Sequence, residues 1–192
     1  MVDETDRHLI GLLRDRDPAA LESIAQTYQH ELRLFCRRMV YSEVLAEDVL
    51  QEILMTCCRA EGDTLPRDSL RGWLYRIARN RCIDQIRKMK PEVRLSAVRS
   101  AAPRGMPRTL MDSATTPAAR AVRQDHADLV QSAVDEMDGE LRSVVIMHFY
   151  QGLSHADVAA ALDLSVSGAK ARVARAVRVL RQRLRHLNDS TS

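Results

Sequence analysis

The chain has 192 residues, of which 29 are Lys or Arg and 26 are Asp or Glu, so its formal net charge is only +3. This balance excludes a uniformly cationic nucleic-acid coat, and any basic binding surface must be local. Glycine is sparse at seven residues while Ala, Leu, Arg and Val are abundant, which favours an all-α fold. No stretch reaches the ~18 consecutive apolar residues typical of a membrane span, and the charged N-terminus is not typical of a signal peptide.

The four cysteines are Cys36, Cys57, Cys58 and Cys82, and their spacing matches no common metal site. The adjacent pair Cys57-Cys58 is also badly placed for an ordinary disulfide framework. We therefore expect a reduced, cytoplasmic protein without a bound metal or other cofactor. A redox- or metal-sensing switch built on these thiols is an alternative, which would require thiol modification or metal to change activity.

The first part of the chain predicts three amphipathic helices. One is expected over about 5–14, and a second begins at Asp17-Pro18, because Asp is a favoured N-cap and Pro is tolerated in the first helical turn. A third begins near Ser42. The apolar face of the second helix is expected to form a core and consists of Leu21, Ile24, Ala25, Tyr28, Leu32, Phe35 and Met39.

The third predicted helix carries an acidic face. It is formed by Glu47, Asp48, Gln51 and Glu52, which are neighbours at helical spacing. Such a face is either solvated or docks on a basic partner. No constellation of histidines accompanies these carboxylates, so acid–base or metal chemistry is not expected and the protein is predicted not to be an enzyme.

A turn-rich connector, EGDTLPRDS over 61–69, leads into a basic helix that ends before Pro91. This helix contains Trp73, the only tryptophan, within an apolar stripe, and its cations could bind a nucleic-acid backbone. Those cations are Arg71, Arg76, Arg79, Arg81, Arg87, Lys88 and Lys90.

The composition then changes over 91–119, where four prolines accompany Ser, Thr and Ala and no periodicity persists. This stretch is predicted to be a flexible linker. It separates an N-terminal helical domain, 1–90, from a C-terminal one, 120–192, in which helices are expected over about 120–137 and 140–150.

The stretch 153–184 predicts a helix-turn-helix. Ser154 and Asp157 have the spacing of a capping box, Asp163 interrupts the pattern, and Ser165 can cap a second helix. The second helix buries an apolar stripe and presents a cationic but sterically smooth opposite face, as a helix that enters the major groove requires. The residues expected to contact DNA are Ser167, Lys170, Ala171, Arg172, Ala174, Arg175 and Arg178.

These features closely resemble the extracytoplasmic-function sigma factors, group 4 of the sigma-70 superfamily, which are promoter-recognition subunits of bacterial RNA polymerase. The resemblance spans nearly the whole chain apart from the linker and the tails. It is carried by Ala46-Glu47-Asp48 with Gln51-Glu52, the run WLYRIARN over 73–80, Ile83-Asp84, Arg87, QGLS over 151–154, Val158-Ala159 and the segment 165–184.

The resemblance implies a division of labour. Glu47, Asp48, Gln51 and Glu52 would dock on the beta-prime clamp helices of core polymerase, and the linker would lie near the RNA exit path. The C-terminal domain would read the minus-thirty-five element and engage the beta flap. The expected minus-ten contacts are Asp63, Thr64, Arg71, Trp73, Arg76, Arg79 and Asn80.

The resemblance also implies control by an anti-sigma factor, which could hold the chain at the membrane although the chain itself does not insert. Three departures from the family pattern are Cys57-Cys58 at positions that are commonly aromatic, Asp163 where Gly is usual, and a connector without aromatics. An ordinary helix-turn-helix regulator, which would bind duplex DNA alone, is the main alternative. Such a regulator would not need an acidic face and a Trp-bearing basic helix together.

Overall fold

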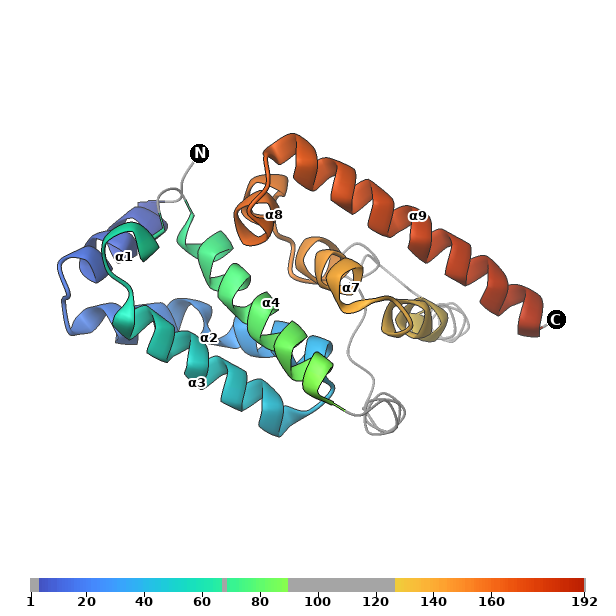
Figure 1. Ribbon diagram of the computed structural model, residues 1–192, viewed down its shortest axis with the longest axis horizontal. Coiled ribbons are helices and arrows are strands. Elements are labelled where there is room, and N and C mark those ends of the chain that lie inside the picture. Colours follow the sequence, from blue (N-terminus) through green and yellow to red (C-terminus); the bar gives the residue numbers. More distant parts are fainter. Residues whose placement is uncertain (1–3, 67–68, 90–126, 192) are drawn as a thin grey trace, which may run out of the picture.

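The computed structural model describes residues 4–66, 69–89 and 127–191, with the side chains of the last helix described as far as Arg185. Every regular element in these ranges is helical, as predicted. Figure 1 shows two groups of helices, α1 to α4 on one side and α7 to α9 on the other. The predicted linker 91–119 and the predicted domain boundaries at 90 and 120 lie outside the described residues.

The N-terminal group contains α1 (Glu4–Arg14), α2 (Ala19–Val40), α3 (Glu43–Arg59) and α4 (Leu70–Lys88). The capping signals lie where the sequence predicted them. Asp17 Oδ1 accepts a hydrogen bond from the Ala19 amide at 2.8 Å, and Ser42 Oγ accepts one from Leu45 at 3.3 Å. Such caps satisfy amides that have no partner inside their own helix.

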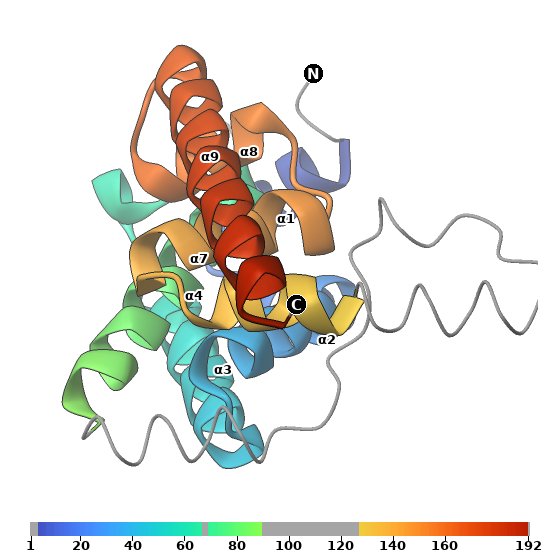
Figure 2. The same ribbon diagram turned by 90° about the vertical axis from the view of Figure 1, so that its right-hand side faces the viewer.

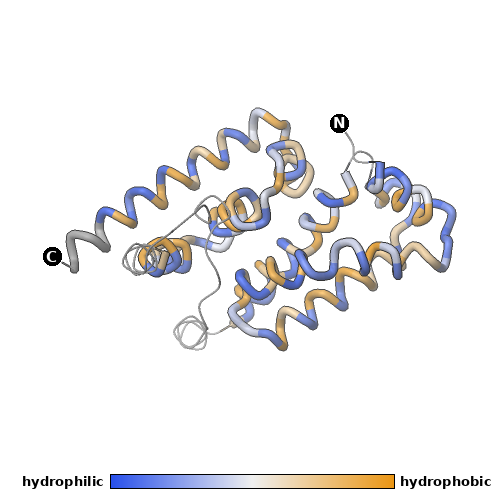
Figure 3. Tube along the Cα trace, turned by 180° about the vertical axis from the view of Figure 1, so that it is seen from behind, coloured by the Kyte–Doolittle hydropathy of each residue, from blue (hydrophilic) through white to orange (hydrophobic). Residues whose placement is uncertain are grey.

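The core of this group lies between α2, α3 and α4, whose inward sides carry the hydrophobic positions in Figure 3. Phe35 and Tyr75 are fully buried and meet edge to face, with ring centroids 5.1 Å apart. Burying a side chain of this size contributes about 1.5–3 kcal/mol. The predicted apolar face of α2 therefore forms core as expected.

The C-terminal group contains the helical residues 127–135, α7 (Gly139–Val145), the π-helical turn η3 (Ile146–Tyr150), α8 (His155–Leu162) and α9 (Val166–Thr191). The single helix predicted over 140–150 is thus an α-helix that widens into a π turn. There the Gln151 amide donates to the carbonyl of Ile146, five residues back, at 3.0 Å. Gly152, at φ +68°, then ends the helix in the left-handed conformation that glycine adopts readily.

The two groups pack against each other, mainly through α4 against α8 and α7, as Figures 1 and 2 show from two sides. The approach is closest at Gly72, where a Cβ atom would lie 2.5 Å from Ala160 Cβ and 3.0 Å from the Asp157 carbonyl oxygen. Only a glycine fits between these backbones. The helix predicted to handle the minus-ten element is therefore partly covered by the C-terminal group.

Candidate nucleic-acid interface

The predicted acidic face lies on the outer side of α3. Glu47 pairs with Arg33 at 3.1 Å and Glu52 with Arg81 at 3.1 Å, so the two ends of this face are held by neighbouring helices. Asp48 and Gln51 are exposed between them. This arrangement leaves the middle of the face open to an external partner.

Two exposed apolar side chains lie on the same side of α3. Val44 is 72% and Met55 49% exposed, and with Asp48 and Gln51 they follow i, i+4, i+7, i+11 spacing. Large apolar groups exposed beside charges are typical of a protein-binding surface rather than of a purely solvated one. Val44 and Met55 were not among the predicted residues, although their helical spacing could have identified them.

The connector before α4 forms a short 3-10 turn, η1 (Gly62–Thr64), which exposes Asp63 and Thr64. The Thr64 hydroxyl accepts a hydrogen bond from the Glu61 amide at 2.8 Å and donates one to the Glu61 carbonyl at 2.7 Å. Gly62, at φ +53°, permits the turn. These bonds give the connector a defined shape from Glu61 to Thr64.

Asp6 of α1 holds the start of α4. Its side chain is 4% exposed, and its Oδ2 accepts hydrogen bonds from the Leu70 amide at 2.9 Å and the Arg71 amide at 3.3 Å. Its Oδ1 accepts one from the Tyr28 hydroxyl, while Ser69 Oγ caps Gly72 at 2.9 Å. A carboxylate also suits the positive end of a helix dipole. No sequence pattern pointed to Asp6, because its partners are 22 and 64 residues away.

Two arginines that were predicted to bind the minus-ten element are engaged within the protein. Arg71 forms a two-pronged pair with Glu31 at 2.7 and 3.0 Å and donates to the Gln151 carbonyl at 3.1 Å. Arg79 pairs with Glu140 and donates to Ser143 Oγ at 3.2 Å. Partners from the C-terminal group therefore occupy both guanidinium groups.

The other predicted minus-ten residues of α4 divide into covered and open ones. Trp73 is 5% exposed and Arg76 is half-buried, whereas Asn80 is exposed. Burial lowers the pKa of Arg79, and the nearby charges of Arg172 and Arg87 lower it further. In this arrangement α4 does not present its predicted DNA contacts together on one open surface.

A buried arginine joins the two groups. Arg142 of α7 is 3% exposed and donates to the Tyr41 hydroxyl at 2.6 Å and to the Met39 carbonyl at 2.8 Å. Its guanidinium carbon also lies 4.7 Å from the centroid of the Tyr41 ring. It thus places a positive charge at the C-terminal end of α2, where the helix dipole is negative. The Ser69 hydroxyl adds a second link by donating to Asp157 Oδ1 at 2.9 Å.

The helix-turn-helix forms as predicted. The Asp157 amide donates to Ser154 Oγ at 3.1 Å, and the carboxylate of Asp157 accepts from the Ser154 amide at 3.3 Å, which completes the capping box. Asp163 takes the left-handed conformation at φ 55°, and Ser165 Oγ accepts from the Gly168 amide at 3.1 Å to start α9. Asp thus replaces the expected glycine in the turn at a modest conformational cost.

The predicted recognition face of α9 is open. Six of its seven predicted DNA contacts are exposed and the seventh, Arg172, is half-buried on the flank towards Arg79. The opposite stripe is buried by Ala169, Val173 and Ala176. The exposed residues are Ser167, Lys170, Ala171, Ala174, Arg175 and Arg178.

The thiols offer little support for a sensor. Cys36, Cys57 and Cys82 are buried, and burial, with the charge of Cys58 as a smaller cause, raises the pKa of Cys57 to about 12. Only Cys58 is exposed. Within the described ranges no group of three or more His, Cys, Asp or Glu side chains could hold a metal ion. Across the same ranges no helix has the length and apolar content to cross a membrane.

The chain matches two models of one family in the expected order. Residues 24–91 match sigma-70 region 2, and residues 127–180 match sigma-70 region 4. The first match contains α3, the connector and α4, and the second contains α7, α8 and α9 as far as Leu180.

Relatives of similar length match across most of the chain. The ECF RNA polymerase sigma factor SigW of Bacillus subtilis is 27% identical over 93% of this chain and 96% of its own. SigX of the same organism is 29% identical over 85% and 82%. The protein SigM of Mycobacterium tuberculosis, also named an ECF RNA polymerase sigma factor, is 25% identical over 99% and 90%.

Two solved structures share the fold. CnrH, in complex with the cytosolic domain of CnrY, is 24% identical and superposes with a TM-score of 0.65 over 98% of this chain and all of that one. The sigma factor RpoE of Bartonella quintana, in complex with the anti-sigma factor NepR, is also 24% identical and gives a TM-score of 0.57 over 87% and 98%. Both sigma-70 regions are matched in order, and relatives named as ECF sigma factors match over most of both chains, so the chain belongs to the extracytoplasmic-function sigma factors of the sigma-70 family.

Proposed function

We propose that this chain directs core RNA polymerase to specific promoters and starts transcription there, as a non-catalytic subunit. The observation that carries this proposal is that one chain holds two different open surfaces. One is the acidic and apolar face of α3, and the other is the cationic face of α9 on a helix-turn-helix. A protein that bound only duplex DNA would need the second surface but not the first.

Core polymerase would dock on α3. The charges of Glu47, Asp48 and Glu52 suit the basic side of a partner helix, and Gln51 adds a polar contact. Val44 and Met55 would supply buried apolar contacts at the two ends of the same stripe. We assign this surface to the clamp helices of the beta-prime subunit, and the beta flap to the C-terminal group.

Promoter DNA would contact two separate surfaces. The minus-thirty-five element would lie on the exposed face of α9 and be read in its major groove. The melted minus-ten element would contact Asp63, Thr64, Arg71, Trp73, Arg76, Arg79 and Asn80. Because Arg71 and Arg79 now bond to Gln151, Glu140 and Ser143, the two groups of helices must part before those arginines can reach DNA.

We also propose that an anti-sigma factor restrains this chain. Both solved structures described above are complexes, one of them with a named anti-sigma factor, which supports such a partner here. Attachment of that partner to a membrane and a cytoplasmic location for this chain remain predictions from the family resemblance, as do the domain limits 1–90, 91–119 and 120–192.

Run-off transcription with purified core polymerase and a library of promoters tests the central proposal. We expect initiation at a defined subset of promoters only when this chain is present. Tight duplex binding by the isolated chain, without any promoter-specific initiation, would instead identify an ordinary helix-turn-helix regulator.

Two variants separate the two surfaces. Asp48→Arg should lower affinity for core polymerase and leave minus-thirty-five discrimination intact in the complexes that still form. Arg175→Ala should keep core affinity and weaken use of the upstream element by about 1–3 kcal/mol, the usual value of a good base contact. Equal loss of core affinity in both variants would contradict this assignment.

A further inference from the structure

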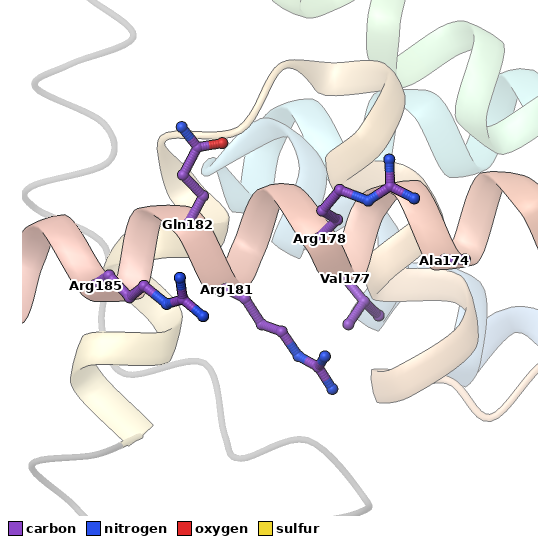
Figure 4. Close-up of a pocket in the computed structure, with 6 residues that line it drawn as sticks. All are labelled: Ala174, Val177, Arg178, Arg181, Gln182 and Arg185. Carbon is purple, nitrogen blue, oxygen red and sulfur yellow. The ribbon is translucent and has the colours of Figure 1, made fainter.

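The basic face of α9 continues beyond the predicted recognition residues. Arg181 and Arg185 are exposed and, with Ala174 and Arg178, follow i, i+4, i+7, i+11 spacing, so they lie on the same side of the helix. The described residues Ala174, Val177, Arg178, Arg181, Gln182 and Arg185 line a groove there. Figure 4 shows these side chains on successive turns of α9. At 1.5 Å per residue the cationic face from Lys170 to Arg185 is about 22 Å long.

The arginines of α9 differ in what they contact. Arg183 points to another side of the helix and pairs with Glu136 at 2.9 Å. Arg178, Arg181 and Arg185, in contrast, form no ion pair with any residue that the structure describes. Three exposed guanidinium groups within about two turns repel one another, and a bound anion would relieve that repulsion.

The composition of the groove distinguishes between two kinds of anionic partner. An amphipathic helix of an acidic protein would need large apolar side chains to pack against, and Ala174 and Val177 are the only apolar residues that line the groove among those described. A sugar-phosphate backbone needs little apolar contact, and each strand of the duplex presents a phosphate about every 3.4 Å of the helix axis. A row of arginines at helical spacing, without large apolar side chains among the lining residues, fits this second partner.

We propose that Arg181 and Arg185 bind the phosphate backbone of duplex DNA that flanks the minus-thirty-five element. This inference rests on the proposed function, because the N-terminal part of α9 must lie in the major groove for its C-terminal part to meet the adjoining backbone. These two arginines position the promoter and extend the footprint, while the residues from Ser167 to Arg178 select its sequence.

The salt dependence of promoter binding tests this role. Holoenzyme made from core polymerase and either the native chain or the double variant R181Q/R185Q is titrated against a promoter from the run-off selection, between 50 and 200 mM KCl. Loss of two phosphate contacts should reduce the slope of log affinity against log salt by about 1.8. Across this range the native complex should therefore lose roughly tenfold more affinity than the variant complex.

Three comparisons locate the effect. Arg183→Gln removes one positive charge from the side of the same helix that is paired with Glu136, and it should leave the slope unchanged. A promoter whose flanking phosphates are replaced by neutral methylphosphonates should bind native and R181Q/R185Q holoenzymes equally. Substituted minus-thirty-five bases should weaken both holoenzymes to the same extent, because phosphate contacts carry no sequence information.

An unchanged slope for R181Q/R185Q, in holoenzyme that initiates normally, would overturn this inference and leave the proposed function standing. A loss of core affinity in the same variant would also overturn it, since the groove would then be a protein contact. If native holoenzyme itself failed to initiate at any promoter, the proposed function would fail instead.

Discussion

Helices α4 and α9 carry the two concentrations of arginine in this chain, but their arginines differ in contacts and exposure. In α4, Arg71 and Arg79 are bonded to acidic and carbonyl groups of other helices, whereas the outward arginines of α9 are exposed. The reason is position, because α4 packs against α1, α2, α3, α7 and α8, while α9 lies at the edge of the molecule. A basic helix can thus form contacts within the protein, present an open binding face, or do the one and then the other at different times.

This difference predicts that changes around α4 alter folding and the contact between the two groups, while changes on α9 alter DNA binding alone. The largest effect should come from Asp6→Ala. It would leave the Leu70 and Arg71 amides and the Tyr28 hydroxyl without their buried acceptor, at a cost of about 3 kcal/mol in the free energy of unfolding. Urea denaturation measures this cost.

Glu4→Ala is the matched control for this change, because Glu4 is an exposed acid in the same turn of α1. It should shift the free energy of unfolding by no more than about 0.5 kcal/mol. A similar cost for both variants would show that α1 does not hold the start of α4.

The next largest effect is expected for Gly72→Ala, which would insert a methyl group between α4 and α8. With Ala160 Cβ only 2.5 Å away, the helices must move apart, and overpacking of this kind costs about 1–3 kcal/mol. Small-angle X-ray scattering should show a larger radius of gyration, together with a lower urea midpoint. Gly11→Ala has no atom within 4 Å of the added group and should instead stabilise α1 by about 0.5–1 kcal/mol.

Glu140→Gln should have a smaller effect on stability and a visible one on binding. It removes the ion pair of Arg79, which is worth about 1 kcal/mol at most, and so weakens the contact between α4 and the C-terminal group. The free chain should then bind single-stranded minus-ten DNA about fivefold more tightly, because ~1 kcal/mol corresponds to that factor. Fluorescence anisotropy with a labelled strand measures the change.

Glu136→Gln removes the same charge from the same half of the chain, but releases Arg183 on α9 rather than an arginine of α4. It should leave binding to the single strand nearly unchanged. An equal gain in both variants would indicate a general charge effect, and the contact between Arg79 and Glu140 would then have no special role.

Local structure was predictable from the sequence to a large extent. The cap formed by Ser154 with Asp157 and the left-handed turn at Asp163 each involve only three or four residues. The neighbouring residues in the sequence are therefore sufficient to predict them. The open face of α9 was predictable for the same reason, since its period follows from helix geometry alone. The resemblance of the motifs to the family then identified the fold class.

Long-range contacts were not predictable in this way. Asp6, Arg142 and Glu140 have no local pattern that distinguishes them from surface charges. The groups that their side chains bond to lie 22 to 103 residues away in the sequence. The covering of α4 by α8 depends on Gly72 meeting Ala160, which is a matter of shape between distant segments. The minus-ten residues were therefore predicted from the family resemblance, without the partners that Arg71 and Arg79 have in the structure.

The smallest expected effect concerns pH and the C-terminal group only. Burial, with the neighbouring His148 and Lys170, lowers the pKa of His155 at the start of α8, where the helix dipole also disfavours a positive charge. The unfolded chain therefore binds more protons than the folded one near and below about pH 6.5. The free energy of unfolding should be highest above that pH and decrease as the pH falls through it.

Urea midpoints at pH 8.0 and 5.5 should differ less for His155→Gln than for the native chain. The control His30→Gln, at an exposed position of α2, should keep the native difference. If instead His155→Gln kept the full native difference, His155 would not contribute to the acid sensitivity.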